Sequence, residues 1–223
     1  MGENTEELVV SLENSLSNDI CDTVGDLAEV GLDAVMDDGI LKDIPILSTV
    51  VGLYRIGHTI RERHEIKQLA LFVAELNRGC TDESKRKQLL EKLNSDTRKS
   101  KQEIEYILVV LDSYLEYEKP KMLAKLYMAY LEQRIGWTEF LMYAAILRTL
   151  LPQDVRILQS HDFNAGALIC MQRDSASWLR LLSAGFVYEQ GVMRFNDDIS
   201  KNHDLDVPYS ITKFGQKFID IVG

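Results

Sequence analysis

The residue types that bind metals and transfer protons are present in this chain, but their spacing matches no common site. His58 and His64 stand six positions apart, and the His-Glu-x-x-His pattern of zinc proteases is absent because no histidine follows His64 four residues later. His203 lies close to Asp204 and Asp206, which offers either a small metal-binding cluster or a polar loop. The polar loop is the favoured interpretation, and the sequence predicts no metal site.

The motifs of nucleophilic catalysis and phosphate binding are also absent. The chain has no glycine-rich phosphate loop, no Gly-x-Ser-x-Gly turn and no cysteine–histidine pattern of a cysteine protease. Its three cysteines, Cys21, Cys80 and Cys170, are far apart and form neither a disulfide framework nor a ligand pair, which favours a reducing, cytoplasmic environment. We therefore expect a non-enzymatic protein without a cofactor.

The net charge of −10 is distributed unevenly along the chain. Residues 1–43 contain 12 acidic residues and one basic residue, whereas residues 44–104 contain 12 basic and 8 acidic residues. These two parts could lie against each other, could form one acidic and one basic contact surface, or could present two solvated helix faces, and solvated faces are the default. The candidate residues for a basic contact surface are Lys85, Arg86 and Lys87.

One apolar stretch raises the question of a membrane. Residues 46–54 are apolar on nearly all sides, and in the stretch 44–57 Ser48, Gly52 and Gly57 have the spacing of close helix contacts. The stretch is too short to span a bilayer, so a central core helix is favoured and a membrane partner is not expected. A membrane-perturbing effector that uses residues 40–57 is the alternative.

Hydrophobic periodicity predicts that most of the chain is helical. In residues 5–36 apolar side chains recur every three or four positions, and Pro45 suits the first turn of a long helix that we expect to reach Asn77. Further helices are expected at about 95–115, 119–133, 138–150 and 153–160, with Pro120, Thr138 and Pro152 at their starts. Helices of this length also leave self-association open.

The last fifty residues have a different pattern. A helix at 174–184 is expected to end at Gly185, because glycine readily adopts the left-handed closing conformation. Residues 186–188 and 192–195 can pair as strands, residues 207–211 form another extended segment, and residues 168–171 suit either a strand or a helical turn. Thr212 then caps a short closing helix.

This order resembles the second half of a MarR-like winged-helix domain, and Ile211-Thr212-Lys213-Phe214-Gly215 matches its "Leu-Thr-x-x-Gly" signature. The predicted fold class is therefore mainly α, with a helical bundle at 1–133 and a winged-helix-like domain at 134–223 that carries a small β-wing. The resemblance implies that nucleic acid or a partner would contact the helix at 174–184 and the wing. The residues that could make this contact are Arg173, Ser175, Ser177, Arg180, Arg194 and Lys201.

Residues 41–54 are also similar to uncharacterised bacterial proteins, some of which are linked with phage defence of the abortive-infection type. This similarity implies a bacterial or phage origin. The acidic wing opposes DNA binding, because phosphate neutralisation supplies most nucleic-acid affinity. We therefore expect an interaction or regulatory protein that binds another protein, in phage defence or counter-defence. A winged-helix DNA-binding regulator is the main alternative.

Overall fold

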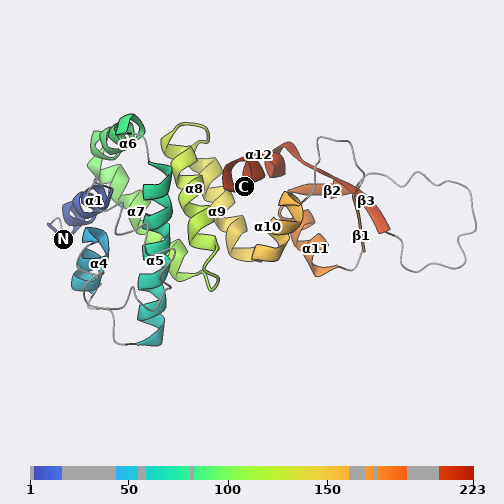
Figure 1. Cartoon of the computed structure of the whole chain (residues 1–223), viewed down its shortest axis with the longest axis horizontal. Coiled ribbons are helices and arrows are strands. Elements are labelled where there is room, and N and C mark those ends of the chain that lie inside the picture. The colour runs from blue at the N-terminus through green and yellow to red at the C-terminus, as the bar shows by residue number, and fades with distance from the viewer. Residues whose placement is uncertain are drawn as a thin grey trace, which may run out of the picture. The chain divides into compact units, whose positions relative to one another are not determined.

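The computed structural model describes residues 3–16, 44–54, 59–80, 83–160, 169–172, 175–189 and 206–223. This part of the chain contains ten α-helices and three short strands, so the predicted mainly α character is confirmed (Figure 1). The chain divides into two compact units after Ala144, and we call residues 1–144 unit 1 and residues 145–223 unit 2. The sequence predicts the boundary between the two domains at residues 133 and 134.

Unit 1 is built around helix α5 (Ile60–Gly79), which packs against α7 (Thr97–Asp112) on one side and α8 (Lys119–Leu131) on the other (Figure 1). Two further helices, α1 (Glu3–Ser15) and α4 (Pro45–Tyr54), pack together, and α1 also contacts α7. Helix α6 (Glu83–Ser95) precedes α7, and α9 (Trp137–Thr149) begins in this unit. Among the helices described, none is long and apolar enough to cross a membrane.

The prediction of one helix from Pro45 to Asn77 is wrong. Helix α4 ends at Tyr54, and α5 starts at Ile60 behind Thr59, whose backbone is extended. The Thr59 hydroxyl accepts from the N–H of Glu62, and the Glu62 carboxylate accepts from the N–H of Thr59 at 2.9 Å. This capping box closes the first turn of α5 and makes it a helix separate from α4.

Ser15 joins three helices of unit 1 through hydrogen bonds of its backbone and side chain. Its hydroxyl accepts from the N–H of Ile46 at 2.8 Å, in the first turn of α4. Its carbonyl accepts from the side-chain amide of Asn77 on α5 at 2.9 Å. Because Ser15, Ile46 and Asn77 are all buried, these bonds satisfy polar groups that have lost water.

An aromatic cluster explains why the start of α9 belongs to unit 1. Trp137 stacks on Phe140 with ring centroids 4.9 Å apart, and both rings also contact Tyr130 of α8. The Tyr130 hydroxyl donates to the buried carboxylate of Glu103 on α7 at 2.6 Å, and the Tyr127 hydroxyl reaches the same carboxylate at 3.4 Å. The first turns of α9 are thus packed against α7 and α8. The helix starts at Trp137, one residue before the predicted start, so Thr138 lies in its first turn.

Unit 2 contains the end of α9, helix α10 (Pro152–Gln159) and an antiparallel sheet flanked by two helices. The elements follow in the order β1 (Ile169–Gln172), α11 (Ala176–Ser183), β2 (Val187–Glu189), β3 (Asp206–Ile211) and α12 (Lys213–Val222). The strand order is β1-β3-β2, with Ile169 opposite Tyr209 and Val187 opposite Ile211. Strand β2 pairs with β3, and residues 192–195, which were predicted to pair with residues 186–188, lie outside the described residues.

Glycine and threonine define the helix ends of unit 2 as predicted. Gly185 has φ of +71°, which closes α11 in the left-handed conformation. The Thr212 hydroxyl accepts from the N–H of Gly215 at 2.9 Å and donates to the carbonyl of Gly185 at 2.7 Å, so it caps α12 and ties it to the end of α11. A Cβ atom on Gly215 would lie 2.9 Å from the Cα of Phe186, so only glycine fits there.

Candidate functional site

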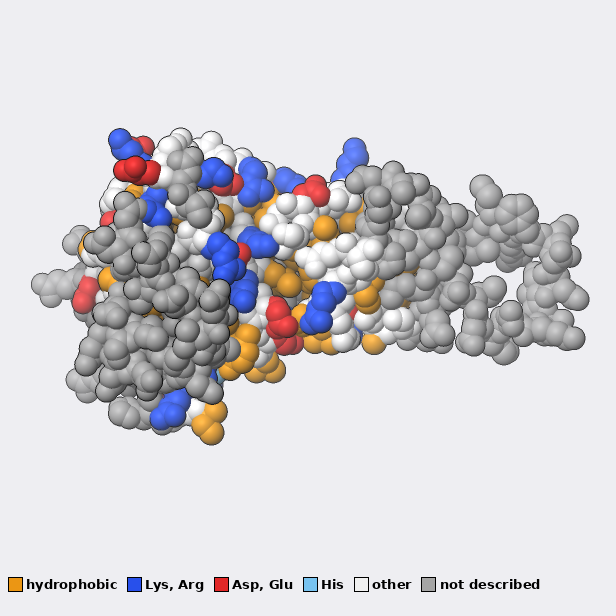
Figure 2. All heavy atoms as spheres, viewed as in Figure 1, with side chains coloured by type: hydrophobic (Ala, Val, Ile, Leu, Met, Phe, Trp, Pro, Cys, Tyr) orange, Lys and Arg blue, Asp and Glu red, His pale blue; other side chains and the backbone are white. Residues whose placement is uncertain are grey.

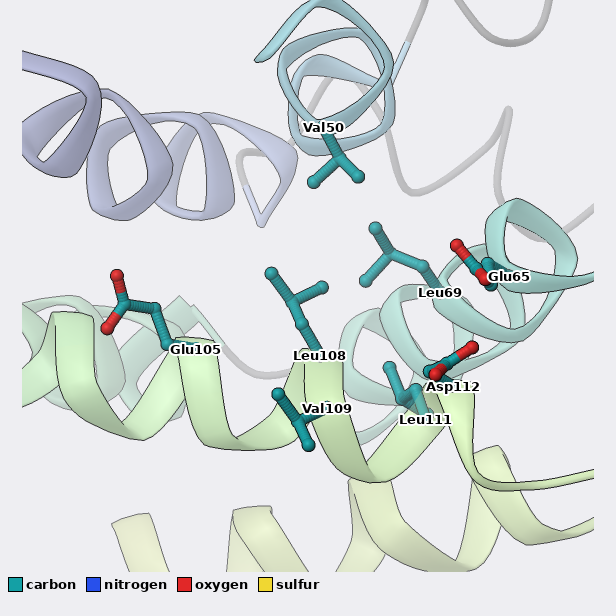
Figure 3. A pocket seen from close by; sticks show the side chains of 8 residues that line it. All are labelled: Val50, Glu65, Leu69, Glu105, Leu108, Val109, Leu111 and Asp112. Atoms are coloured by element: carbon teal, nitrogen blue, oxygen red, sulfur yellow. The ribbon is translucent and has the colours of Figure 1, made fainter. Parts of the chain in front are cut away.

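A groove lies between α4, α5 and α7 in unit 1. Its volume is about 610 Å³. Apolar side chains form its middle and carboxylates lie at its two ends, as Figure 3 shows. The lining residues are Val50, Glu65, Leu69, Glu105, Leu108, Val109, Leu111 and Asp112. A volume of this size lies within the range of binding sites for ligands, and its lining is mostly apolar, as binding sites usually are.

Helical periodicity brings the lining residues to one face of each helix. On α7, Glu105, Leu108, Val109 and Asp112 recur at intervals of three and four residues. Leu69 lies four residues after Glu65 on α5, and Val50 points toward them from α4 (Figure 3). Leu69, Leu111 and Val50 are buried, but the Val109 side chain is 71% exposed on the α7 wall. The groove therefore offers apolar surface to a ligand from solution.

At one end of the groove, Arg61 is shared by two carboxylates. The Arg61 guanidinium donates to both oxygens of Asp112, at 2.9 and 2.7 Å, and to Glu65 Oε1 at 3.1 Å. This cluster joins the first turn of α5 to the last turn of α7. Because the Arg61 side chain is 74% exposed, the ion pairs contribute little to stability. They leave two negative charges against one positive charge.

The pKa values of the Glu65 and Asp112 carboxyl groups are shifted in opposite directions. Partial burial raises the pKa of Glu65, and its hydrogen bond with Asp112 raises the pKa further. The hydrogen bond from Arg61 lowers the pKa of Asp112 despite its partial burial. Oppositely shifted pKa values within one cluster occur at many functional sites.

His64 and Gln68 fix the turn that follows α7. His64 Nε2 lies 2.8 Å from the carbonyl of Tyr114, and the Gln68 side-chain amide donates to the same carbonyl at 3.2 Å. The His64 ring also packs on Tyr117 with a centroid distance of 5.3 Å. These contacts give His64 a structural role, and they hold the C-terminal end of α7, with Asp112, against α5.

The predicted contact helix presents a different surface from the one expected. On α11 the Arg180 guanidinium donates to both oxygens of the buried Asp154, at 2.6 and 2.8 Å, and it also lies 3.3 Å from the hydroxyl of Ser177. Ser177 is buried and Ser175 is the N-cap residue. The exposed apolar side chains of α11 are Leu179 and Leu182. Arg180 is therefore engaged within unit 2 rather than free for a ligand. The remaining predicted contacts Arg173, Arg194 and Lys201 lie outside the described residues.

The predicted basic surface lies on α6. Lys85 and Lys87 are exposed, whereas Arg86 is partly buried and donates to the carbonyl of Cys80 at 3.0 Å. On the face shown in Figure 2, basic and acidic side chains alternate across the described surface. A further lysine, Lys92, donates to the carbonyls of Tyr130 and Leu131 at the end of α8 and so has a capping role.

The metal cluster considered at His203, Asp204 and Asp206 stays a prediction, because His203 and Asp204 lie outside the described residues and the side chain of Asp206 is not described. Across the ranges that the structure does describe, no three His, Cys, Asp or Glu side chains gather to hold a metal ion. The Arg61–Glu65–Asp112 cluster was missed by the sequence reasoning. Its only local signal is the Arg61–Glu65 spacing of one helical turn, because Asp112 lies 51 residues from Arg61.

Comparison of the chain with protein-family models, with curated proteins and with solved structures finds no match.

Proposed function

We propose that this protein is a non-enzymatic interaction protein that binds another protein through the groove between α4, α5 and α7. The observation that carries the proposal is the combination of a cavity of about 610 Å³ with Val109, a large apolar side chain that is 71% exposed on its wall. Exposed apolar surface that is continuous with a groove is typical of protein-binding sites. A partner helix that packs its apolar face into this groove would bury the groove lining and the exposed Val109 side chain.

The matched pair of variants Val109→Glu and Val10→Glu tests this proposal. Val10 is 50% exposed on α1 of the same unit and does not line the groove. Neither change buries a charge, so both variants are expected to keep the far-ultraviolet circular dichroism spectrum of the parent chain. A tagged chain is used to capture partners from host lysate treated with nuclease, and the recovered proteins are quantified by mass spectrometry.

The expected result is one stoichiometric protein partner that the parent chain and Val10→Glu retain and Val109→Glu loses. A partner that all three chains retain equally would place the contact away from the groove and would refute the proposed site. Because the similarity of residues 41–54 points to phage conflict, the same three variants should be compared for phage plating in the host. We propose a cytoplasmic location, because the three cysteines of the sequence form no disulfide framework.

The order of elements in unit 2 supports an alternative function, that of a winged-helix DNA-binding transcriptional regulator. The order α11, β2, β3 and α12 with a three-stranded antiparallel sheet favours this alternative. The Arg180–Asp154 pair argues against DNA contact by Arg180, because the guanidinium already donates to a buried carboxylate. Salt-dependent binding of a random DNA duplex in fluorescence anisotropy would favour the alternative, and no binding at low salt would exclude it.

The membrane alternative for residues 40–57 has less support. Ile46, Leu47 and Val50 of α4 are buried within unit 1, so they are not available to a bilayer. A liposome sedimentation experiment tests this directly, and we expect the chain to stay in the supernatant.

A further inference from the structure

We infer that the occupant of the groove is an amphipathic helix that carries a lysine or arginine at the end facing Glu65 and Asp112, with apolar side chains over the middle of the groove. This inference rests on the proposed function, because it specifies the partner of the same site. It follows from how charge is distributed between the two ends of the groove.

Among the described side chains, the end at Asp112 has two carboxylates and one cation within ion-pair distance. That cation is Arg61, which pairs with both Glu65 and Asp112. A carboxylate oxygen has two lone pairs, so the bonds from Arg61 do not use all the acceptor positions of either group. A cation from a partner would restore the balance and find acceptors, and a partner carboxylate would be repelled.

The other end of the groove is balanced. Glu105 pairs with Lys101 one turn earlier on α7, with Lys101 Nζ 3.5 Å from Glu105 Oε1. Glu105 and Asp112 are seven residues apart, which is two helical turns or about 10.5 Å along α7. The two acidic ends therefore differ in free charge. A partner cation is expected at the Asp112 end alone, which gives the bound helix a preferred position along the groove.

The side chains in the middle of the groove determine where the partner helix must be apolar. Val50, Leu69, Leu108 and Val109 lie between the acidic ends (Figure 3). A partner helix covering these two turns would use apolar side chains at positions i, i+3 or i+4, and i+7, which share one helical face. The cation would then follow within one turn of the last apolar residue.

Selection from a displayed library of helical peptides tests this inference on the full chain. The peptides have about 14 residues, or four turns, with a fixed alanine-rich frame and random side chains on one face. Peptides are enriched on the parent chain and counted after selection on Val109→Glu, on the double variant Glu65→Gln/Asp112→Asn and on Glu105→Gln. Their affinities are measured by fluorescence polarisation, and circular dichroism checks that each variant is folded.

We expect enriched peptides to carry the apolar spacing and one lysine or arginine at a fixed position after it. Binding should be lost on Val109→Glu and should weaken up to about fivefold on Glu65→Gln/Asp112→Asn, as expected for one partly exposed ion pair. It should be unchanged on Glu105→Gln, whose charge is already paired. Replacing the peptide cation with glutamine should weaken binding to the parent chain and have no effect on the double variant.

Two failures are distinguishable. Peptides that bind Val109→Glu as well as the parent chain would refute the groove itself and with it the proposed function. Peptides that need Val109 but show no preferred cation, or bind Glu65→Gln/Asp112→Asn as tightly as the parent chain, would overturn the inference about charge and leave the groove as the binding site.

Discussion

Replacement of Asp154 by alanine is expected to destabilise unit 2 by about 3 kcal/mol, because this carboxylate is the centre of a buried polar network. Asp154 is fully buried and accepts hydrogen bonds from Arg180 at 2.6 and 2.8 Å and from the N–H of Leu151 at 2.8 Å. The Arg180 bonds join α10 to α11, and the Leu151 bond closes the first turn of α10. Removing the carboxylate leaves both donors without an acceptor.

The magnitude follows from the exposure of the two partners. Breaking a buried ion pair by removing one partner costs about 3 to 5 kcal/mol. The Arg180 side chain is 27% exposed, so water can solvate part of its charge and the lower end of this range applies. Arg180→Ala should cost about the same, because it leaves a fully buried carboxylate with the Leu151 N–H and the Ser177 hydroxyl but no positive charge. The double variant should cost about 4 kcal/mol, so the coupling between the two sites is about 2 kcal/mol.

The chain contains two tryptophans, which allows the effect to be assigned to one unit. Trp178 is buried in unit 2, and Trp137 lies in unit 1. In a Trp137→Phe background, urea unfolding followed by fluorescence reports on unit 2 alone, which avoids treating a chain of two units as two-state. Asp220→Ala is the control, since Asp220 accepts a hydrogen bond from Gln216 at 2.8 Å on the exposed face of α12. It should cost less than about 1 kcal/mol.

At acid pH, the parent chain and Asp154→Ala should differ less in their free energy of unfolding. Burial raises the pKa of Asp154, but the hydrogen bonds from Arg180, Leu151 and Ser177 outweigh it and lower the pKa below the ordinary value. A lowered pKa contributes stability above the unfolded pKa, and this stability is lost as pH falls through the folded pKa. The difference should stay constant from pH 7 to about pH 4 and shrink below that. The reasoning would be refuted if Asp154→Ala lowered the free energy of unfolding by less than about 1 kcal/mol at pH 7. It would also be refuted if the costs of Asp154→Ala and Arg180→Ala simply added in the double variant.

Three further predictions concern other contacts. Gly215→Ala should destabilise unit 2 by about 1 to 3 kcal/mol in the Trp178 assay, because its Cβ would collide with the backbone of Phe186 and force α12 away. Thr212→Val should cost about 1 kcal/mol in the same assay by removing the cap of α12 while keeping the side-chain volume. Burial and the nearby Glu103 carboxylate raise the pKa values of Tyr127 and Tyr130 above the ordinary tyrosine value. Because the unfolded chain would lose these protons first, stability should fall above about pH 10, and ultraviolet absorbance titration should find both phenols un-ionised until unit 1 unfolds.

The sequence predicted the helices well where the signals are local. Pro120 and Pro152 lie in first turns, Gly185 closes α11, and Thr212 caps α12. Each of these features depends on the backbone within a few residues. The break before Ile60 was also encoded locally, by the capping box of Thr59 and Glu62. The apolar periodicity on both sides of this break nevertheless predicts one continuous helix.

Long-range contacts could not be predicted in the same way. Strand β2 pairs with β3, and this pairing depends on the whole sheet rather than on signals within a few residues. Arg180 was expected to face a ligand, but its partner Asp154 lies 26 residues earlier on another helix. The acidic end of the groove needs α5 beside α7, and no spacing in the sequence places Asp112 next to Arg61.

The hydrogen bonds of Ser15 have a consequence for synthesis of the chain. Ser15 is translated 31 residues before Ile46 and 62 residues before Asn77, its two buried donors. At the usual 5 to 20 residues per second, the wait for Asn77 is about 3 to 12 seconds. The apolar face of α1, which includes Leu8 and Leu12, waits longer still, because α1 packs on α4 and on α7, and α7 starts only at Thr97. Nascent unit 1 is therefore expected to need ribosome-associated chaperones until α7 has left the ribosome.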